Sequence, residues 1–315
     1  MKADNNRVLI IALAANVGIA VAKFAAAAIT GSSAMLTEGV HSLVDSTNQL
    51  LLMYGQKRAA KPADAAHPGG YGRELYFWSF VVALLVFALG AGVSVYEGVI
   101  HFLEPEPAIS PLVAYIVLAI AFALEAGSTV AAFQEFNRAR GDQSWLAALT
   151  STKDATTVIV LLENGAAMAG IVIAAVGLAV SQLTGDPRFD GVASVLIGLL
   201  LGVVAIFLAR EAKGLLIGEA ADPVLTAGIR RIATRPGITG VGEIITIHNA
   251  PEQIVAAVNV DFDNRLGAGD VERIVDEIER DLQAEFPAIY RVYVRPHENA
   301  GTKFGDGRGL APAIP

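Results

Sequence analysis

Six long apolar runs precede residue 212, and this feature constrains the fold more than any other. They cover residues 8–30, 34–54, 75–103, 111–136, 154–182 and 190–210. About 20 apolar residues in a helix cross the roughly 30 Å hydrocarbon core of a bilayer, so each run is long enough to span it. The chain is 54% hydrophobic and 17% charged, whereas soluble domains carry about 25% charge. We therefore expect residues 1–212 to form a transmembrane domain, a bundle of six helices.

The distribution of lysine and arginine predicts how these helices are oriented. The loop of residues 56–74 and the loop after residue 136 are basic, and so are the N-terminus and the exit from the sixth run. The loops on the other side contain one basic residue, Arg188. Because basic loops stay in the cytoplasm, we expect both termini there, in a bacterial cytoplasmic membrane. No cleavable signal peptide is evident, and the net charge of −8 argues against a nucleic-acid partner.

The composition changes after Lys213. Residues 223–235 and 270–286 have helical patterns, whereas residues 241–248, 253–261 and 289–295 have strand patterns. The order helix, strand, strand, helix, strand within residues 213–299 favours a small cytoplasmic ferredoxin-like α+β domain. The tail, residues 300–315, is rich in glycine and is expected to be disordered.

Ionisable side chains within the second and fifth runs are the strongest indication of function. His41 and Asp45 are one helical turn apart and so lie on one face, with about 6 Å between their Cβ atoms. Glu163 and Asn164 should reach the same depth in the bilayer. Histidine and carboxylate are zinc ligands, and the chain has no cysteine to serve instead. The alternative is that these groups only form hydrogen bonds between helices.

Other polar residues support weaker hypotheses. Glu125, in the fourth run, could carry protons or pair with a cation. Asn48 is expected to form an interhelical hydrogen bond, and Lys23 to snorkel toward the outer interface. His248 and His297 are candidates for a regulatory metal site in the C-terminal domain, although lone histidines on such a domain are more often ordinary surface residues.

Several of these segments resemble one known family. The stretch from Gly31 to Asp45, GSSAMLTEGVHSLVD, resembles the second-span signature of the cation diffusion facilitator family. The segments HPGGYGRE (residues 67–74), YEG (residues 96–98) and LLENGAA (residues 161–167) resemble other motifs of that family. The resemblance covers residues 8–298. It implies a homodimeric, proton-coupled antiporter that exports Zn²⁺, or Mn²⁺, Fe²⁺, Co²⁺ or Cd²⁺, by alternating access.

One position departs from the family pattern. The resemblance implies a second His/Asp and Asp pair in the fifth span, but Asn164 stands where the carboxylate belongs and Val160 lies four residues before it. A branch similar to the mitochondrial-type zinc carriers has Leu-Leu-Glu-Asp at this place. Glu163 or a water molecule could supply the fourth ligand, and a site richer in oxygen would favour Mn²⁺ or Fe²⁺.

Two functions of other classes compete with transport. A membrane-bound metal sensor or scaffold would bind metal without moving it across the bilayer. An intramembrane enzyme is not expected, because Ser128 has no histidine near it in the sequence and the His-Glu-x-x-His signature is absent.

Overall fold

The computed structural model describes residues 2–105, 110–141, 144–145, 155–251 and 253–298. The chain divides into two compact units. The helical unit comprises Met1–Arg58 and Glu74–Lys213, and the C-terminal unit comprises Ala59–Arg73 and Gly214–Pro315. The tail predicted to be disordered, residues 300–315, lies outside the described residues.

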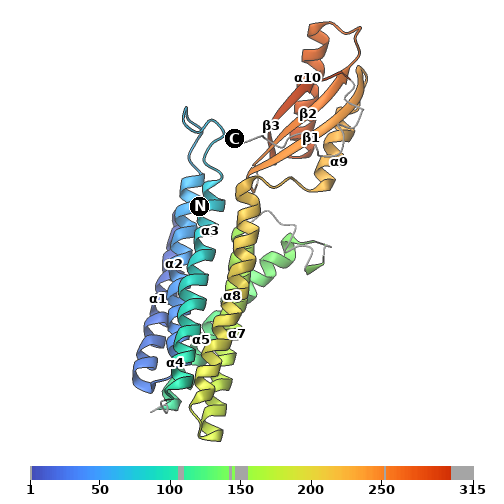
Figure 1. Ribbon diagram of the computed structural model, residues 1–315. Coiled ribbons are helices and arrows are strands. Elements are labelled where there is room, and N and C mark those ends of the chain that lie inside the picture. Colours follow the sequence, from blue (N-terminus) through green and yellow to red (C-terminus); the bar gives the residue numbers. More distant parts are fainter. Residues whose placement is uncertain (1, 106–109, 142–143, 146–154, 252, 299–315) are drawn as a thin grey trace. The chain divides into compact units, whose positions relative to one another are not determined.

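Long helices make up the helical unit (Figure 1). They are α1 (Lys2–Thr30), α2 (Ser33–Ala59), α3 (Glu74–Leu85), the π-helix η1 (Val86–Ala91), α4 (Gly92–Leu103), α5 (Pro111–Ala139), α7 (Ala155–Thr184) and α8 (Arg188–Ile217). Among the described residues, four helical stretches are long and apolar enough to cross a membrane: Glu74–Leu103, Pro111–Arg138, Val158–Thr184 and Arg188–Ile217. The apolar part of α1, Asn16–Thr30, is shorter.

Glycines allow close approach between the helices. A Cβ at Gly98 of α4 would lie 2.7 Å from the Gly191 carbonyl oxygen of α8, and one at Gly198 would lie 2.7 Å from Val95. At Gly39, a Cβ would lie 2.9 Å from the Phe24 ring, which brings α1 against α2. Small residues at such crossings are typical of helices that pack within a bilayer, where the hydrophobic effect does not drive association.

The C-terminal unit contains a three-stranded sheet covered by two helices. Its elements are α9 (Pro223–Ala233), β1 (Ile238–Ala250), β2 (Gln253–Phe262), α10 (Ala268–Glu285) and β3 (Ile289–Pro296). The strand order is β1-β2-β3, with β1 antiparallel and β3 parallel to β2. Alternate residues of β2, such as Val258, pack in a core with Ile229 of α9 and Ile278 of α10. The element order is the one predicted from the sequence.

The loop Ala59–Arg73 belongs to the C-terminal unit although it connects α2 to α3. Asn249 Nδ2 donates to the Gly69 carbonyl oxygen at 3.3 Å, and Tyr290 Oη donates to the same oxygen at 3.4 Å. A Cβ at position 72 would lie 2.5 Å from the Asn249 carbonyl oxygen, so only glycine fits there without a shift. This attachment was not predicted from the sequence.

Candidate metal centre

Helix α2 places His41 and Asp45 on one face, as their spacing predicts. His41 is 3% exposed, and its Nε2 lies 3.0 Å from Asp45 Oδ2. Asp45 retains 19% of its side-chain exposure. Of this pair, His41 is therefore buried, and Asp45 is the member that solvent can reach.

Glu163 of α7 faces the same region of α2. Asn48 is fully buried and donates from Nδ2 to Glu163 Oε1 at 2.7 Å. Asn48 lies three residues after Asp45, so His41, Asp45 and Asn48 follow one face of the helix. The interhelical hydrogen bond expected of Asn48 is present, and its partner is one of the candidate ligands.

A polar cavity of about 310 Å³ brings most of the predicted site residues together. Asp45, Glu163 and Asn164 line it, and Glu125 of α5 lines it too. Along α2 the lining continues from Asp45 to Gln56, a rise of about 16 Å toward the helix end that carries Lys57 and Arg58. His41 is connected to this cavity through Asp45.

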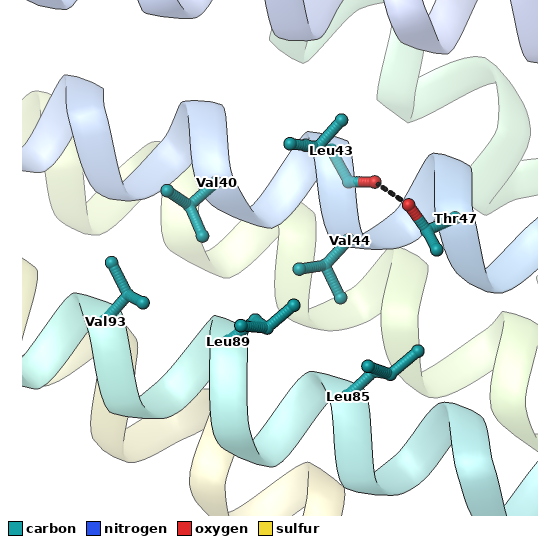
Figure 2. A pocket seen from close by; sticks show the side chains of 7 residues that line it. All are labelled: Val40, Leu43, Val44, Thr47, Leu85, Leu89 and Val93. Carbon is teal, nitrogen blue, oxygen red and sulfur yellow. Dashed lines mark hydrogen bonds between the residues drawn. The ribbon is translucent and has the colours of Figure 1, made fainter.

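A second cavity, between α2 and the segment from α3 to α4, has a different lining. Figure 2 shows Val40 and Val44 pointing toward the helical segment that carries Leu85, Leu89 and Val93. Leu43 also lines this cavity, whose volume is about 200 Å³. Its one polar side chain, Thr47, donates its hydroxyl to the Leu43 carbonyl oxygen of the same helix at 2.9 Å. No carboxylate or imidazole lines this cavity.

The described residues do not form a closed ligand set. In that part of the chain, no three histidine, aspartate or glutamate side chains are close enough to hold one ion together. Glu163 is bonded to Asn48 instead, and Glu125 has Ser128 Oγ 3.4 Å from its Oε2. The structure thus brings these acidic groups to one cavity, with Glu163 held by a neutral amide.

The two histidines of the C-terminal unit are far apart. His248 is buried on β1 and pairs with Ile254 at one end of β2, whereas the His297 N–H donates to the Val260 carbonyl oxygen at the other end. Six residues of strand separate those positions, about 20 Å at 3.3 Å per residue. A single regulatory site containing both histidines therefore does not fit this sheet.

Sequence reasoning missed two buried polar clusters in the helical unit. Lys23, expected to snorkel, is completely buried and contacts Glu38 and Ser42. The expectation was wrong because α2 packs over this face of α1 and supplies both partners. At the other cluster, Asp190 of α8 accepts hydrogen bonds from Ser32 Oγ at 2.8 Å and from the Ser33 N–H at 2.6 Å. The serines and the glutamate in the second-span motif were the available signal.

Comparison with known proteins places this arrangement in a family. Residues 9–217 match the model described as the cation efflux transmembrane domain. The chain is 32% identical over 266 residues to the mitochondrial proton-coupled zinc antiporter SLC30A9 of Xenopus laevis, covering 81% of this chain and 47% of that protein. It is 35% identical over 195 residues to metal tolerance protein C4 of Arabidopsis thaliana, covering 61% of this chain and 43% of that protein.

A shorter relative aligns along most of both chains. The cation-efflux pump FieF of Cronobacter sakazakii is 24% identical over 260 residues, which is 82% of this chain and 81% of the pump. The chain spans about half the length of the SLC30A9 relatives that it matches. The matched domain confirms the family predicted from the sequence motifs: this multi-pass membrane protein belongs to the cation efflux, or cation diffusion facilitator, family.

Proposed function

We propose that this protein moves divalent metal ions, Zn²⁺ foremost, across a membrane in exchange for protons. The observation that carries the proposal is the polar cavity lined by Asp45, Glu163 and Asn164. His41 adjoins this cavity, because its Nε2 lies 3.0 Å from Asp45 Oδ2. Imidazole nitrogen and carboxylate oxygen suit Zn²⁺. The names of the zinc antiporter and metal tolerance relatives agree with this cargo.

The exchange of protons for metal follows from the chemistry of these ligands. Metal binding requires a neutral imidazole and ionised carboxylates, so the ion displaces protons and protons displace the ion. In our proposal the ion first meets Asp45 through the cavity, and Glu163 then leaves Asn48 to join it. Asn48 holds Glu163 ready for this step, because its amide donates a hydrogen bond that an arriving cation can replace.

The same proposal includes a topology. We infer six spans, with α1 and α2 crossing the membrane despite their polar residues, and both termini in the cytoplasm. The part of the cavity near Gln56 would then lie on the cytoplasmic side, next to Lys57 and Arg58. Ions would enter from the cytoplasm and leave on the opposite face. A homodimer, implied by the family resemblance, completes the proposed assembly.

Proteoliposome transport tests the site. Asp45→Ala and His41→Ala should each reduce Zn²⁺ flux under a pH gradient by about 100-fold or more, since losing even an outer-shell partner of a metal ligand costs about 10–100-fold. Asp276→Ala is the matched control, because this aspartate is exposed on α10. Full flux in both site variants would refute the transport site. Zn²⁺ binding without flux in the wild-type protein would instead identify a sensor.

The cavity lining also favours a second cargo. Asp45, Glu125, Glu163 and Asn164 can present only oxygen to an ion that stays within the cavity, and oxygen ligands suit Mn²⁺ and Fe²⁺. Competition among Zn²⁺, Mn²⁺, Fe²⁺, Co²⁺ and Cd²⁺ in the same assay ranks the cargoes. If Mn²⁺ is carried by oxygen ligands alone, His41→Ala should abolish Zn²⁺ flux and spare Mn²⁺ flux.

A further inference from the structure

A lysine and a glutamate form a fully buried ion pair between α1 and α2. Lys23 Nζ lies 2.8 Å from Glu38 Oε2 and donates to Ser42 Oγ at 2.8 Å. Both charged side chains are 0% exposed. The other oxygen, Glu38 Oε1, has no hydrogen-bond partner among the described residues. A Cβ at Gly170 of α7 would overlap it, so three helices meet at this carboxylate.

The pair lies on the faces of α1 and α2 that lead to the metal centre. Glu38 precedes His41 by three residues and Asp45 by seven, so all three follow one face of α2. On α1, Asn16 lines the polar cavity and Lys23 is seven residues, or two turns, further along the same face. Neither Lys23 nor Glu38 lines the cavity itself. They lie beyond His41, out of reach of an ion in the cavity.

Burial makes these charges act strongly on the site. Desolvation of two ions offsets most of the energy of a buried pair, and apolar residues of similar size often pack as well. What an apolar pair cannot supply is electrostatic potential. One unit charge about 10 Å from a dication changes its binding constant by tenfold or more in a medium of effective dielectric constant about 20.

We propose that Lys23 and Glu38 set the affinity of the metal centre through their charges, without contacting the metal. The inference rests on the proposed function. Lys23 is a fixed internal cation that opposes a second positive charge nearby, and Glu38 cancels most of this effect. Either charge alone would shift the affinity of the Asp45 and Glu163 site, and the balance of the two holds that affinity near the value that the ligands themselves give.

Charge-neutralising variants distinguish this electrostatic role of the ion pair from a purely structural one. Glu38→Gln leaves the lysine charge uncompensated and should weaken Zn²⁺ binding about tenfold or more. Lys23→Met leaves the glutamate charge and should strengthen Zn²⁺ binding by a similar factor. The double variant, Lys23→Met with Glu38→Gln, should return to within about threefold of wild type, because it has no net charge at this place, and neither has the intact ion pair.

Zn²⁺ titration of the detergent-solubilised full-length protein measures these dissociation constants. Shifts of opposite sign support the proposal. If the two dissociation constants shift in the same direction, or do not shift, the proposal is overturned. A purely structural contact between α1 and α2 would weaken Zn²⁺ binding in both variants. Arg231→Met and Glu285→Gln are the matched controls: this ion pair is exposed on the C-terminal unit and should leave Zn²⁺ binding unchanged.

A charge swap keeps the test decisive if a single variant does not fold. Lys23→Glu combined with Glu38→Lys retains a buried pair but moves the cation to α2, one turn from His41. This protein should bind Zn²⁺ at least about tenfold more weakly than wild type, and an unchanged constant overturns the proposal. Asp45→Ala separates the two levels of inference. If that variant binds Zn²⁺ normally, the metal centre itself is wrong; if it loses binding while the pair variants show no opposed shifts, only the role of the pair is wrong.

Discussion

The helical unit buries charged side chains such as Lys23, Glu38 and Asp190, whereas the described part of the C-terminal unit buries no lysine, arginine, aspartate or glutamate. Among the described residues of the C-terminal unit, the buried polar side chains are Thr246 and His248. Its ion pairs, such as Arg231 with Glu285 and Arg273 with Glu277, lie at the surface. The two units of one chain therefore differ in where they place their charged side chains, inside the helical unit and on the surface of the C-terminal unit.

This difference concerns the free-energy cost of burying charged side chains. A charge inside a membrane bundle is expensive and needs a partner or a function. Each charge that is buried among the described residues of the helical unit has a partner near the metal centre or near the start of α2. The C-terminal unit gains its stability from apolar burial, and its exposed pairs contribute little. Substitutions should therefore act on stability in the C-terminal unit, and on both stability and transport in the helical unit.

The largest expected effect on stability is in the apolar core of the C-terminal unit. Ile278 on α10 is 0% exposed and packs in the core cluster with β2. Ile278→Ala should destabilise this unit by about 2–5 kcal/mol, because it leaves a cavity that the sheet cannot fill. Hydrogen exchange of the β2 amides in the full-length protein measures the loss.

The matched control for this variant is Val224→Ala, since Val224 is 75% exposed. It should change stability by less than about 0.5 kcal/mol. Equal protection of β2 in the Ile278 variant and in wild type would show that apolar packing does not hold the unit together, and the contrast between the two units would fail.

An intermediate effect is expected where α8 anchors the start of α2. Asp190 Oδ2 accepts from the Ser33 N–H at 2.6 Å and from the Ala34 N–H at 3.3 Å, while its Oδ1 accepts from Ser32 Oγ. A carboxylate at this place satisfies free amides of a helix N-terminus and complements its dipole. Asp190→Ala should cost about 1–3 kcal/mol, because these donors stay buried without an acceptor.

Asp190 also fixes the position of the helix that carries His41 and Asp45, so its loss should lower Zn²⁺ flux as well as the unfolding temperature. Thermal unfolding in detergent and proteoliposome flux measure the two effects, and Glu104→Ala is the control, because this glutamate is exposed directly after α4. If stability fell while flux stayed at the wild-type level, Asp190 would support only the fold. The residues required for transport would then be those of the cavity.

The same contrast explains what could be predicted from sequence. Apolar runs and strand alternation are local patterns, so they reveal helices and the C-terminal element order. The pairing of His41 with Asp45 is local too, because it needs only one helical turn. The contacts of Asn48 with Glu163 and of Ser33 with Asp190 join residues 115 and 157 positions apart. No periodicity encodes such contacts, and for that reason Lys23 was placed at the interface and the docking of Gly69 on Asn249 was missed.

The smallest effect is expected at the exposed ion pairs of the C-terminal unit. Hydrogen bonds from the Arg265 side chain and backbone lower the pKa of Asp263 from 3.8 to about 2. A depressed carboxyl pKa adds stability above the ordinary value, and this contribution disappears as the pH falls through about 2. Because the Arg265 side chain is 89% exposed, solvent screens most of that gain.

Arg265→Ala should therefore return the Asp263 pKa toward 3.8, while the unfolding midpoint at pH 7 and the Zn²⁺ flux stay at wild-type values. NMR titration of carboxyl-labelled full-length protein reads the pKa, and thermal unfolding at pH 7 and pH 3 reads the stability. Any small difference from wild type should be present at pH 7 and shrink on acidification, since protonation of Asp263 removes the interaction that the variant lacks. A loss as large as that of Asp190→Ala would mean that surface charge, and not the apolar core alone, supports this unit.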